Sequence, residues 1–269
     1  MAITALHSAA TGLSALSTQL DVISNNLANV NTDGFKASRA NFQDLLYIEK
    51  AQPGVENANG DQRPTGLYVG LGVKVSGTQV DFTQGSLINT GQTLDIAIEG
   101  AGFFQVQVET ERAANGIAYT RAGNFTLNRD GELVLANDQG RRLEPNITIP
   151  DGVESISISG DGRVLAQIAG QAQPQEVGQI ELARFINPTG LRQIGENLYA
   201  ETDASGAPTT DIPTQNSLGQ LRQGFVEGSN VNPTRELIGL IRTQRAFEMN
   251  SQSIRTADEA LQTVAQLRR

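Results

Sequence analysis

The sequence contains no cysteine, no tryptophan and a single histidine, His7, among its 269 residues. The chain therefore has no disulfide, no thiolate nucleophile, no zinc site of Cys and His ligands and no pair of imidazoles. Most enzyme templates are excluded on this ground. His7 has no second ligand nearby in the sequence, which favours a structural or surface role. We expect no enzyme, no catalytic residue, no cofactor and no metal.

Positive charge is also scarce, since 20 Lys and Arg residues face 29 Asp and Glu residues and the net charge is −9. Such a chain repels phosphate, so nucleic acid is a poor partner. The first 35 residues contain no Lys or Arg and no apolar run long enough for a secretory signal or a membrane span. Composition alone suggests a cytoplasmic protein.

Apolar residues near the N-terminus recur at the spacing of a coiled-coil seam. Turn residues from Asn31 to Gly34 follow, so we expect the first helix to end there. The seam consists of Leu6, Leu13, Leu20 and Leu27 at intervals of seven, with Ala9, Leu16, Ile23 and Val30 three positions after each.

The C-terminal segment repeats this pattern. Asn232 followed by Pro233 is typical of a helix N-cap and first helical position. The second seam consists of Leu240, Phe247, Ile254 and Leu261 at intervals of seven, accompanied by Leu237, Ala257 and Val264.

Between these helices, short alternating runs such as residues 94–108 indicate strands. Turn pairs at Asn115-Gly116, Asp130-Gly131, Asp151-Gly152 and Asp161-Gly162 suit an antiparallel β domain built from hairpins, which we place at 76–227. Segments 51–66 and 203–217 are rich in Gly, Pro, Asn, Asp and Thr and are predicted to be long loops. The predicted fold class is α+β: discontinuous N- and C-terminal coiled-coil helices with a central, mainly antiparallel β domain.

The first helix carries Ser, Thr, Gln and Asn off its seam, where a solvated coiled coil usually carries Glu and Lys. Uncharged polar side chains can hydrogen-bond across close interfaces without the cost of burying charge. This composition favours a helix surrounded by copies of itself, although an ordinary intramolecular helical hairpin fits the spacing too.

Three long stretches resemble flagellar rod and hook proteins, and the resemblance covers nearly the whole chain. They are ISNNLANVNTDGFKASRANFQDLL (23–46), DIAIEGAGFFQV with YTRAGNFTLNRDGELV (95–106 and 119–134), and GFVEGSNVNPTRELIGLIRTQRAFEMNSQSIRTADEALQ (224–262). Within this family, residues 52–75 and 194–208 are similar to the distal rod type rather than to hook or proximal rod subunits.

The resemblance implies an inner helical domain of residues 1–34 and 228–269 that lines a channel, a connecting segment at 35–75, and an outer β domain. It implies a rigid hollow helical homopolymer that transmits torque and lets exported subunits pass. The implied partners are proximal rod subunits, hook subunits, periplasmic and outer-membrane ring proteins and the flagellar export machinery. The implied location is the basal body, crossing the periplasm to the outer membrane after export without a cleaved signal peptide.

The expected polymerisation interface joins both seams to the asparagines Asn25, Asn26 and Asn29, which could otherwise be ordinary helix-end residues. The loop residues Gln52, Pro53, Gly54, Gly60 and Pro64 are expected to form a rod-stiffening segment, because hook subunits usually lack a counterpart; a surface linker is the plain alternative. Two other functions remain open: a secreted, adhesin-like β-domain protein dimerised by its helices, and an enzyme that hydrolyses sugar polymers with a carboxylate pair.

Overall fold

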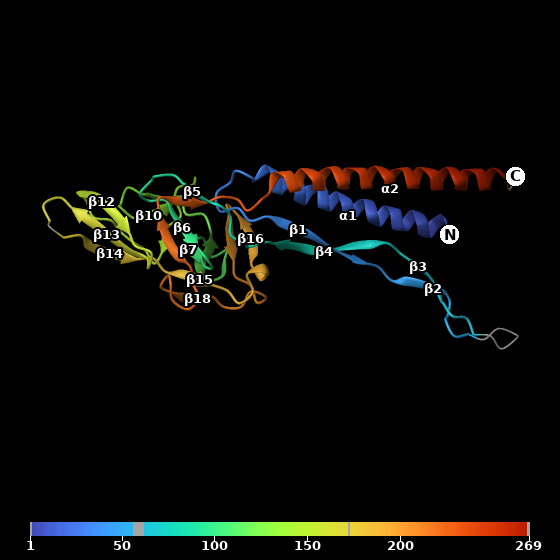
Figure 1. Cartoon of the computed structure of the whole chain (residues 1–269), viewed down its shortest axis with the longest axis horizontal. Helices are drawn as coiled ribbons and strands as arrows, with labels where there is room; N and C mark the ends of the chain where they lie inside the picture. Colours follow the sequence, from blue (N-terminus) through green and yellow to red (C-terminus); the bar gives the residue numbers. More distant parts are fainter. Residues whose placement is uncertain (1, 56–61, 172, 268–269) are drawn as a thin grey trace. The chain divides into compact units, whose positions relative to one another are not determined.

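The computed structural model describes residues 2–55, 62–171 and 173–267. The chain divides into two compact units (Figure 1). Unit 1 comprises residues 1–28, 38–80 and 232–269, and unit 2 comprises residues 29–37 and 81–231. The α+β fold class is confirmed, because a long helix lies near each end of the chain and the strands between them pair antiparallel.

The two long helices are α1 (Ala2–Ala28) and α2 (Pro233–Leu267). As predicted, α1 ends before the turn residues, where the Thr32 amide donates to the Asn29 carbonyl. Asn232 caps α2, since its Oδ1 accepts from the Arg235 amide at 3.0 Å. Sequence reasoning therefore located both helices from periodicity and cap chemistry.

Unit 1 also contains a long hairpin, which consists of two antiparallel ribbons in succession. β1 (Ser38–Asp44) pairs with β4 (Val73–Val80), and β2 (Tyr47–Ala51) pairs with β3 (Leu67–Gly70). Since α1 contacts α2 on one side and both β1 and β4 on another, it lies between the second helix and the first ribbon (Figure 1).

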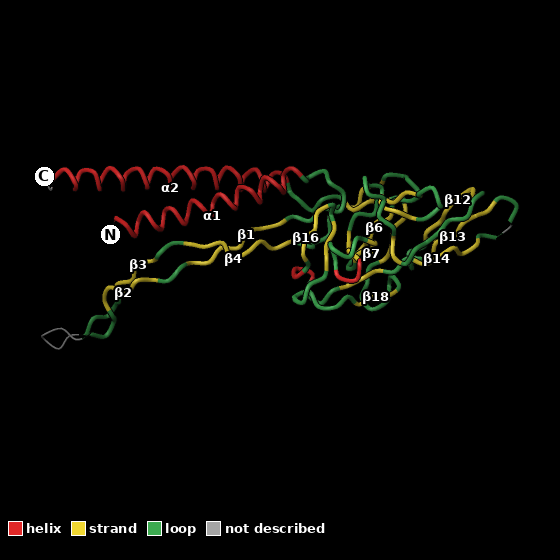
Figure 2. Tube along the Cα trace, turned by 180° about the vertical axis from the view of Figure 1, so that it is seen from behind, coloured by secondary structure: helices red, strands yellow, loops and turns green. Residues whose placement is uncertain are grey.

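Unit 2 contains the remaining strands (Figure 2). Their pairings are antiparallel. The largest sheet has the order β16-β17-β8-β7-β15-β18, with β11 also paired to β7. Its strands are β7 (Phe103–Gln107), β8 (Ile117–Thr120), β11 (Leu143–Glu144), β15 (Leu182–Arg184), β16 (Arg192–Gly195), β17 (Leu198–Ala200) and β18 (Thr209–Asp211).

Smaller sheets complete unit 2. A three-stranded sheet has the order β12-β13-β14, and three further pairs join β9 to β10, β6 to β19 and β5 to β20. These strands are β5 (Leu87–Asn89), β6 (Ile96–Glu99), β9 (Phe125–Leu127), β10 (Leu133–Leu135), β12 (Val153–Ile158), β13 (Arg163–Ile168), β14 (Gln175–Gln179), β19 (Gln220–Gln223) and β20 (Phe225–Glu227).

The hydrophobic core lies in unit 2. Its apolar side chains come from strands distant in sequence, and fully buried members include Ile96, Ile98, Phe104, Val106, Leu143, Ile180 and Leu182. Two Asp-Gly turns were predicted correctly: Asp130-Gly131 joins β9 to β10 and Asp161-Gly162 joins β12 to β13, with both glycines at positive φ. Asp151-Gly152 instead precedes β12, whose partner is the following strand β13.

One loop prediction needs correction. Segment 203–217 contains β18, in which β-branched Thr209 and Thr210 pair with Arg184 and Ala183 of β15. The connecting segment 35–75 forms most of the paired hairpin just described, because its two halves satisfy each other's backbone groups. Within the predicted loop 51–66, residues 56–61 lie outside the described residues.

Candidate assembly interface

The two terminal helices pack closely through small residues. A Cβ placed on Gly12 of α1 would lie 3.1 Å from Asn250 Nδ2 of α2, and one on Gly239 of α2 would lie 3.5 Å from Ile23 Cδ1. Thr243, which is 3% exposed, also lies in α2, and its Oγ1 donates to the Gly239 carbonyl at 2.9 Å. The two glycines thus allow a close approach of the helices, and Thr243 bonds to the backbone of its own helix.

The predicted α1 seam is only half-covered within one chain. Ile23 is buried, whereas the leucines remain half-buried and Val30 lies in the turn after α1. The placement of Val30 in the helical seam is therefore wrong, because the backbone leaves the helix at Ala28. The half-buried seam residues are Leu6, Leu13, Leu16, Leu20 and Leu27.

On α2, Leu240 and Ile254 are half-buried, whereas Leu237, Phe247 and Leu261 are exposed; the side chain of Val264 lies outside the described part of the chain. Ile238, Ile241 and Met249 expose 47%, 49% and 65% of their surface, and the heptad reading missed them because they lie off its spacing. An apolar patch of this kind on a helix usually marks a contact with another chain.

The three asparagines differ in their surroundings. Asn26 is 2% exposed; its Nδ2 donates to the Ser38 carbonyl at 2.8 Å, and its Oδ1 accepts from the Ser38 amide at 2.9 Å. This pair of bonds ties the end of α1 to β1 inside one chain. Asn25 is exposed, and Asn29 is half-buried just after the helix.

The hairpin approaches α1 where the two ribbons meet. A Cβ on Gly72 would lie 2.1 Å from Thr11 Oγ1, so only glycine allows this contact without displacement. The Thr11 hydroxyl also accepts from the Val73 amide at 3.4 Å, and the Ser8 hydroxyl donates to the Gly70 carbonyl at 3.3 Å. These bonds fix the hairpin to the helix at the junction of its two ribbons.

The hairpin exposes apolar and aromatic side chains along both of its ribbons. Nearer its end, the Gly54 amide donates to the Arg63 carbonyl at 2.8 Å, and Arg63 in turn donates to Val55 at 3.1 Å. Gln52 and Pro53 follow β2, Pro64 precedes β3, and Gly60 lies outside the described residues. The exposed side chains are Phe42 (41%), Leu46 (83%), Tyr47 (57%), Ile48 (40%), Leu67 (55%) and Tyr68 (51%).

Unit 2 contains a buried ion cluster that sequence reasoning missed. Lys36 Nζ lies 2.5 Å from Glu227 Oε1, and Arg121 Nη1 lies 3.3 Å from Glu227 Oε2. Lys36 also donates to the Thr83 carbonyl at 2.8 Å, and Glu227 accepts from the Gly85 amide at the same distance. Burial lowers the pKa of Lys36 and of Arg121, and the Glu227 carboxylate opposes both shifts.

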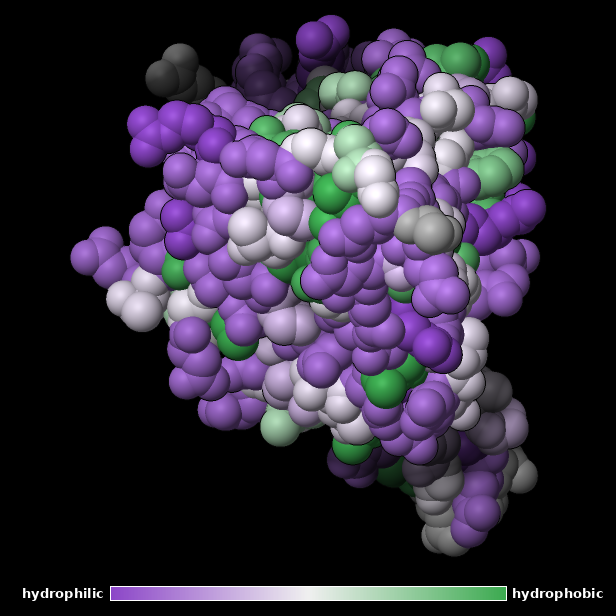
Figure 3. Space-filling view, turned by 90° about the vertical axis from the view of Figure 1, so that its left-hand side faces the viewer, coloured by the Kyte–Doolittle hydropathy of each residue, from purple (hydrophilic) through white to green (hydrophobic). Residues whose placement is uncertain are grey.

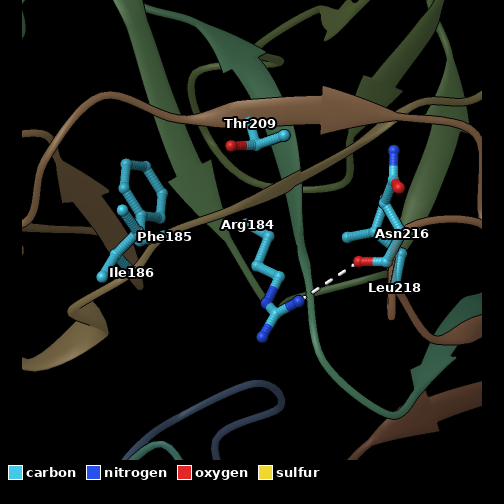
Figure 4. Close-up of a pocket in the computed structure, with 6 residues that line it drawn as sticks. All are labelled: Arg184, Phe185, Ile186, Thr209, Asn216 and Leu218. Carbon is cyan, nitrogen blue, oxygen red and sulfur yellow. Dashed lines mark hydrogen bonds between the residues drawn. The ribbon is translucent and has the colours of Figure 1, made fainter.

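Two hollows flank Arg184 on unit 2. One, of about 290 Å³, is lined by Phe185, Ile186, Thr209, Asn216 and Leu218 together with Arg184. In Figure 4 the Arg184 side chain extends toward the Asn216 carbonyl, to which Nη1 donates at 3.2 Å. The second hollow shares Arg184, Phe185 and Ile186 and has a volume of about 400 Å³.

The described residues include no group of three or more His, Asp or Glu side chains placed to hold a metal ion. Among those same residues, neither long helix has the length and apolarity needed to cross a bilayer. The face of unit 2 in Figure 3 is mostly hydrophilic, with hydrophobic residues scattered over it.

Comparison with known proteins places this architecture in a family. Three family models match: "Flagella basal body rod protein" at residues 6–36, "Flagellar hook protein FlgE/F/G D1 domain" at 97–166, and "Flagellar basal body rod FlgEFG protein C-terminal" at 222–267. They cover most of α1, part of unit 2 and all of α2.

Individual relatives align with most of the chain. The flagellar basal-body rod protein FlgG of Buchnera aphidicola (subspecies Schizaphis graminum) is 47% identical over 257 residues, 96% of each chain. The FlgG protein of Bacillus subtilis is 39% identical over 269 residues, 98% of each chain. The rod protein FlgF of Caulobacter vibrioides is 35% identical over 238 residues, 86% of this chain and 83% of its own.

Proposed function

Because the chain belongs to the flagellar basal-body rod protein family, we propose that it is a structural subunit of the distal rod of the bacterial flagellum. In this role it polymerises into a rigid hollow helical tube that transmits motor torque to the hook and lets exported subunits pass. The observation that carries the proposal is the apolar surface left on α1 and α2, in a chain whose relatives along its full length are rod proteins.

The proposed polymerisation interface combines both helical seams with the exposed apolar side chains of α2. A helix pair buries only one side of each helix, so the half-buried leucines of α1 and exposed Leu237, Phe247 and Leu261 gain most from neighbouring copies. Asn25 and Asn29 supply polar groups at the same end of α1. Asn26 supports this end indirectly, by holding it against β1.

The proposed location is the basal body, across the periplasm to the outer membrane. The proposed partners are further copies of the chain, proximal rod subunits, hook subunits, the periplasmic and outer-membrane ring proteins and the flagellar export machinery. We propose no catalytic role, since the relatives are structural rod proteins.

The hairpin segment containing Gln52, Pro53, Gly54, Gly60 and Pro64 is proposed to stiffen the tube. Within this segment the hairpin exposes Ile48 and Val55 at the end of a two-stranded ribbon, which is marginally stable without further packing. Docking on an axial neighbour would bury these side chains and hold all subunit spacings equal. A tube with equal spacings is straight.

Gel filtration followed by electron microscopy tests the function. We expect the purified protein to elute as a monomer when dilute and to form tubes when concentrated. A fixed dimer that never forms tubes would contradict the proposal and favour the adhesin-like alternative, which the relatives do not support. Release of sugar fragments from purified peptidoglycan would instead indicate an enzyme.

A further inference from the structure

The larger of the two hollows that flank Arg184 has two guanidinium groups among its lining residues. Arg121 and Arg184 line it together with Phe82, Gln84, Phe103 and Pro188. Arg184 comes from the end of β15, whereas Arg121 follows β8. No described carboxylate lines this hollow, so its electrostatic character is positive in a chain that is acidic overall.

Arg121 is short of hydrogen-bond acceptors. It is 4% exposed, and its Nη1 reaches only Glu227, a carboxylate that it shares with Lys36. Its Nε is buried without a partner among the described residues, and its guanidinium carbon lies 5.2 Å from the centre of the Phe103 ring. Two cations thus share one buried anion, and a further acceptor near Arg121 would compensate the excess positive charge.

Other polar groups at the hollow are already engaged. The Gln84 side chain donates to the Ile98 carbonyl at 3.1 Å and accepts from the Gly100 amide at 3.0 Å. Arg184 makes one hydrogen bond, to the Asn216 carbonyl, and a guanidinium has five N–H donors. The arginines are therefore the groups with donors to offer a ligand.

The rim of the hollow is apolar. Ile186 is 92% exposed, the most exposed large apolar side chain in the described chain, and half-buried Phe82 lies on the same hollow. A free hydrated anion gains nothing from such a rim. A carboxylate on an aliphatic stem gains from both parts, since its stem covers Ile186 and its oxygens meet the guanidiniums.

We propose that this hollow receives a Glu or Asp side chain of a second copy of the chain, forming an ion pair between neighbouring subunits in the assembled tube. The chain itself supplies candidates, since it carries 29 acidic residues. The inference rests on the proposed function, because a tube of copies is what brings a second unit 2 to this face. It adds a contact between β units to the contacts between helices.

A charge-reversal variant tests this contact, and the quantity measured is the critical concentration of tube formation. Arg184→Glu should raise the critical concentration of tube formation about tenfold or more, because two like charges then face each other across a desolvated contact. Arg129→Glu is the matched control, since the Arg129 side chain is 94% exposed and lies away from the hollow. It should assemble like the wild type. Equal critical concentrations for both variants would overturn the inference.

Zero-length cross-linking identifies the occupant. Arg184→Lys keeps the positive charge and adds an amine, in a chain whose natural lysines are Lys36, Lys50 and Lys74. A carbodiimide added to tubes of mixed ¹⁴N and ¹⁵N protein should join this amine to an Asp or Glu, giving mixed-isotope peptides on mass spectrometry. Arg129→Lys should give none.

The outcomes separate this inference from the proposed function. Tubes in which the introduced amine joins only carboxylates of its own chain, or none, would overturn the inference and leave the function standing. Protection of that amine by millimolar phosphate in the dilute monomer, without cross-links in tubes, would identify a free-anion site instead. A wild type that forms no tubes would contradict both.

Discussion

At the scale of single residues, the buried Lys36, Arg121 and Glu227 cluster joins three distant parts of the sequence. Lys36 precedes β1, Arg121 follows β8, and Glu227 ends β20. Gly34, at φ 70°, lets the same connection pass against the backbone of Ala122, since a Cβ there would lie 2.5 Å from the Ala122 nitrogen. The cluster and this close approach hold residues 29–37 within unit 2.

Glu227→Gln should strongly destabilise unit 2. The change leaves Lys36 and Arg121 buried without their shared anion, which costs roughly 3 to 5 kcal/mol in the free energy of unfolding. Urea denaturation of dilute protein measures this value. Glu154→Gln, at an exposed position of β12, is the control and should change it by less than about 0.5 kcal/mol. A loss below about 1 kcal/mol for Glu227→Gln would show that the cluster contributes little.

The buried Tyr119 side chain makes the free energy of unfolding of unit 2 depend on pH in the alkaline range. It is 2% exposed, and burial, with a smaller contribution from Glu201, raises the pKa of its hydroxyl to about 12. Because the unfolded pKa is about 10, the stabilisation from a neutral Tyr119 is fully present below pH 10 and is lost as pH rises toward 12.

Between pH 10 and 12, the free energy of unfolding should therefore fall by roughly 2 kcal/mol less in Tyr119→Phe than in the wild type. Urea titration at each pH measures this value. Tyr68→Phe, at a residue 51% exposed on the hairpin, is the control and should leave the slope unchanged. Identical slopes for both variants would mean that water reaches the Tyr119 hydroxyl.

Sequence reasoning reached some residues and missed others for identifiable reasons. Heptad spacing singled out Leu20 and Ile23, which are half-buried and buried on α1, because a seam repeats locally. It missed Ile238 and Ile241, because they lie off the repeat. No local pattern could pair Lys36 with Glu227, since 191 positions separate them and only the fold brings them together.

At the scale of elements, the residues of α1 differ in how far the chain itself buries them. Ala15, Ile23 and Asn26 are buried inside the chain, whereas Leu20 keeps apolar surface that a second copy can cover. The stability of unit 2 does not depend on Leu20, because the core of unit 2 is drawn from its own strands.

Leu20→Asp should abolish tube formation and leave the melting of unit 2 unchanged. An unpaired carboxylate at a repeated helical contact costs several kcal/mol at each copy. Leu20→Met, which conserves volume, is the control and should assemble normally. Sedimentation measures assembly and near-ultraviolet circular dichroism follows melting. Tubes formed by Leu20→Asp would show that this seam faces no neighbour.

The hairpin is the element that sequence reasoning described least well. Its strands read as a connection because SRANFQD and YIEKA do not alternate cleanly between apolar and polar residues. Pairing across the hairpin supplies the order that the pattern lacks. The exposed Leu46, Tyr47 and Leu67 then become visible as surface rather than core.

Deletion of residues 48–63 should leave polymerisation intact and make the rods bend. The cut removes most of β2 and the end of the hairpin but spares β1 and β4, so the ribbon against α1 remains. Curvature is measured on electron micrographs. Replacement of the same residues by a Gly-Ser linker of equal length is the control for length, and it too should bend. If the deletion rods are as straight as those of the wild type, the segment does not stiffen the rod and is a surface linker.

At the scale of the whole molecule, each unit assembles residues that the sequence keeps apart. Unit 1 gathers both helices and the hairpin, while residues 29–37 belong to unit 2 with the β strands. The domain boundaries predicted at residues 34, 75 and 227 lie where the residue composition changes from that of a helix to that of strands. The two compact units are instead defined by contacts between residues, and these contacts cannot be read from composition. The domain limits as first placed therefore remain a prediction about the assembled rod.

The central claim is that the chain builds a tube through its two helical ends. Cryo-electron microscopy of tubes assembled from the purified protein tests it most directly. We expect α1 and α2 at the smallest radius, around an open channel, with Leu20 and Leu237 against helices of other copies and unit 2 outside. A reconstruction in which unit 2 lines the channel, or in which the helices touch no other copy, would contradict the account.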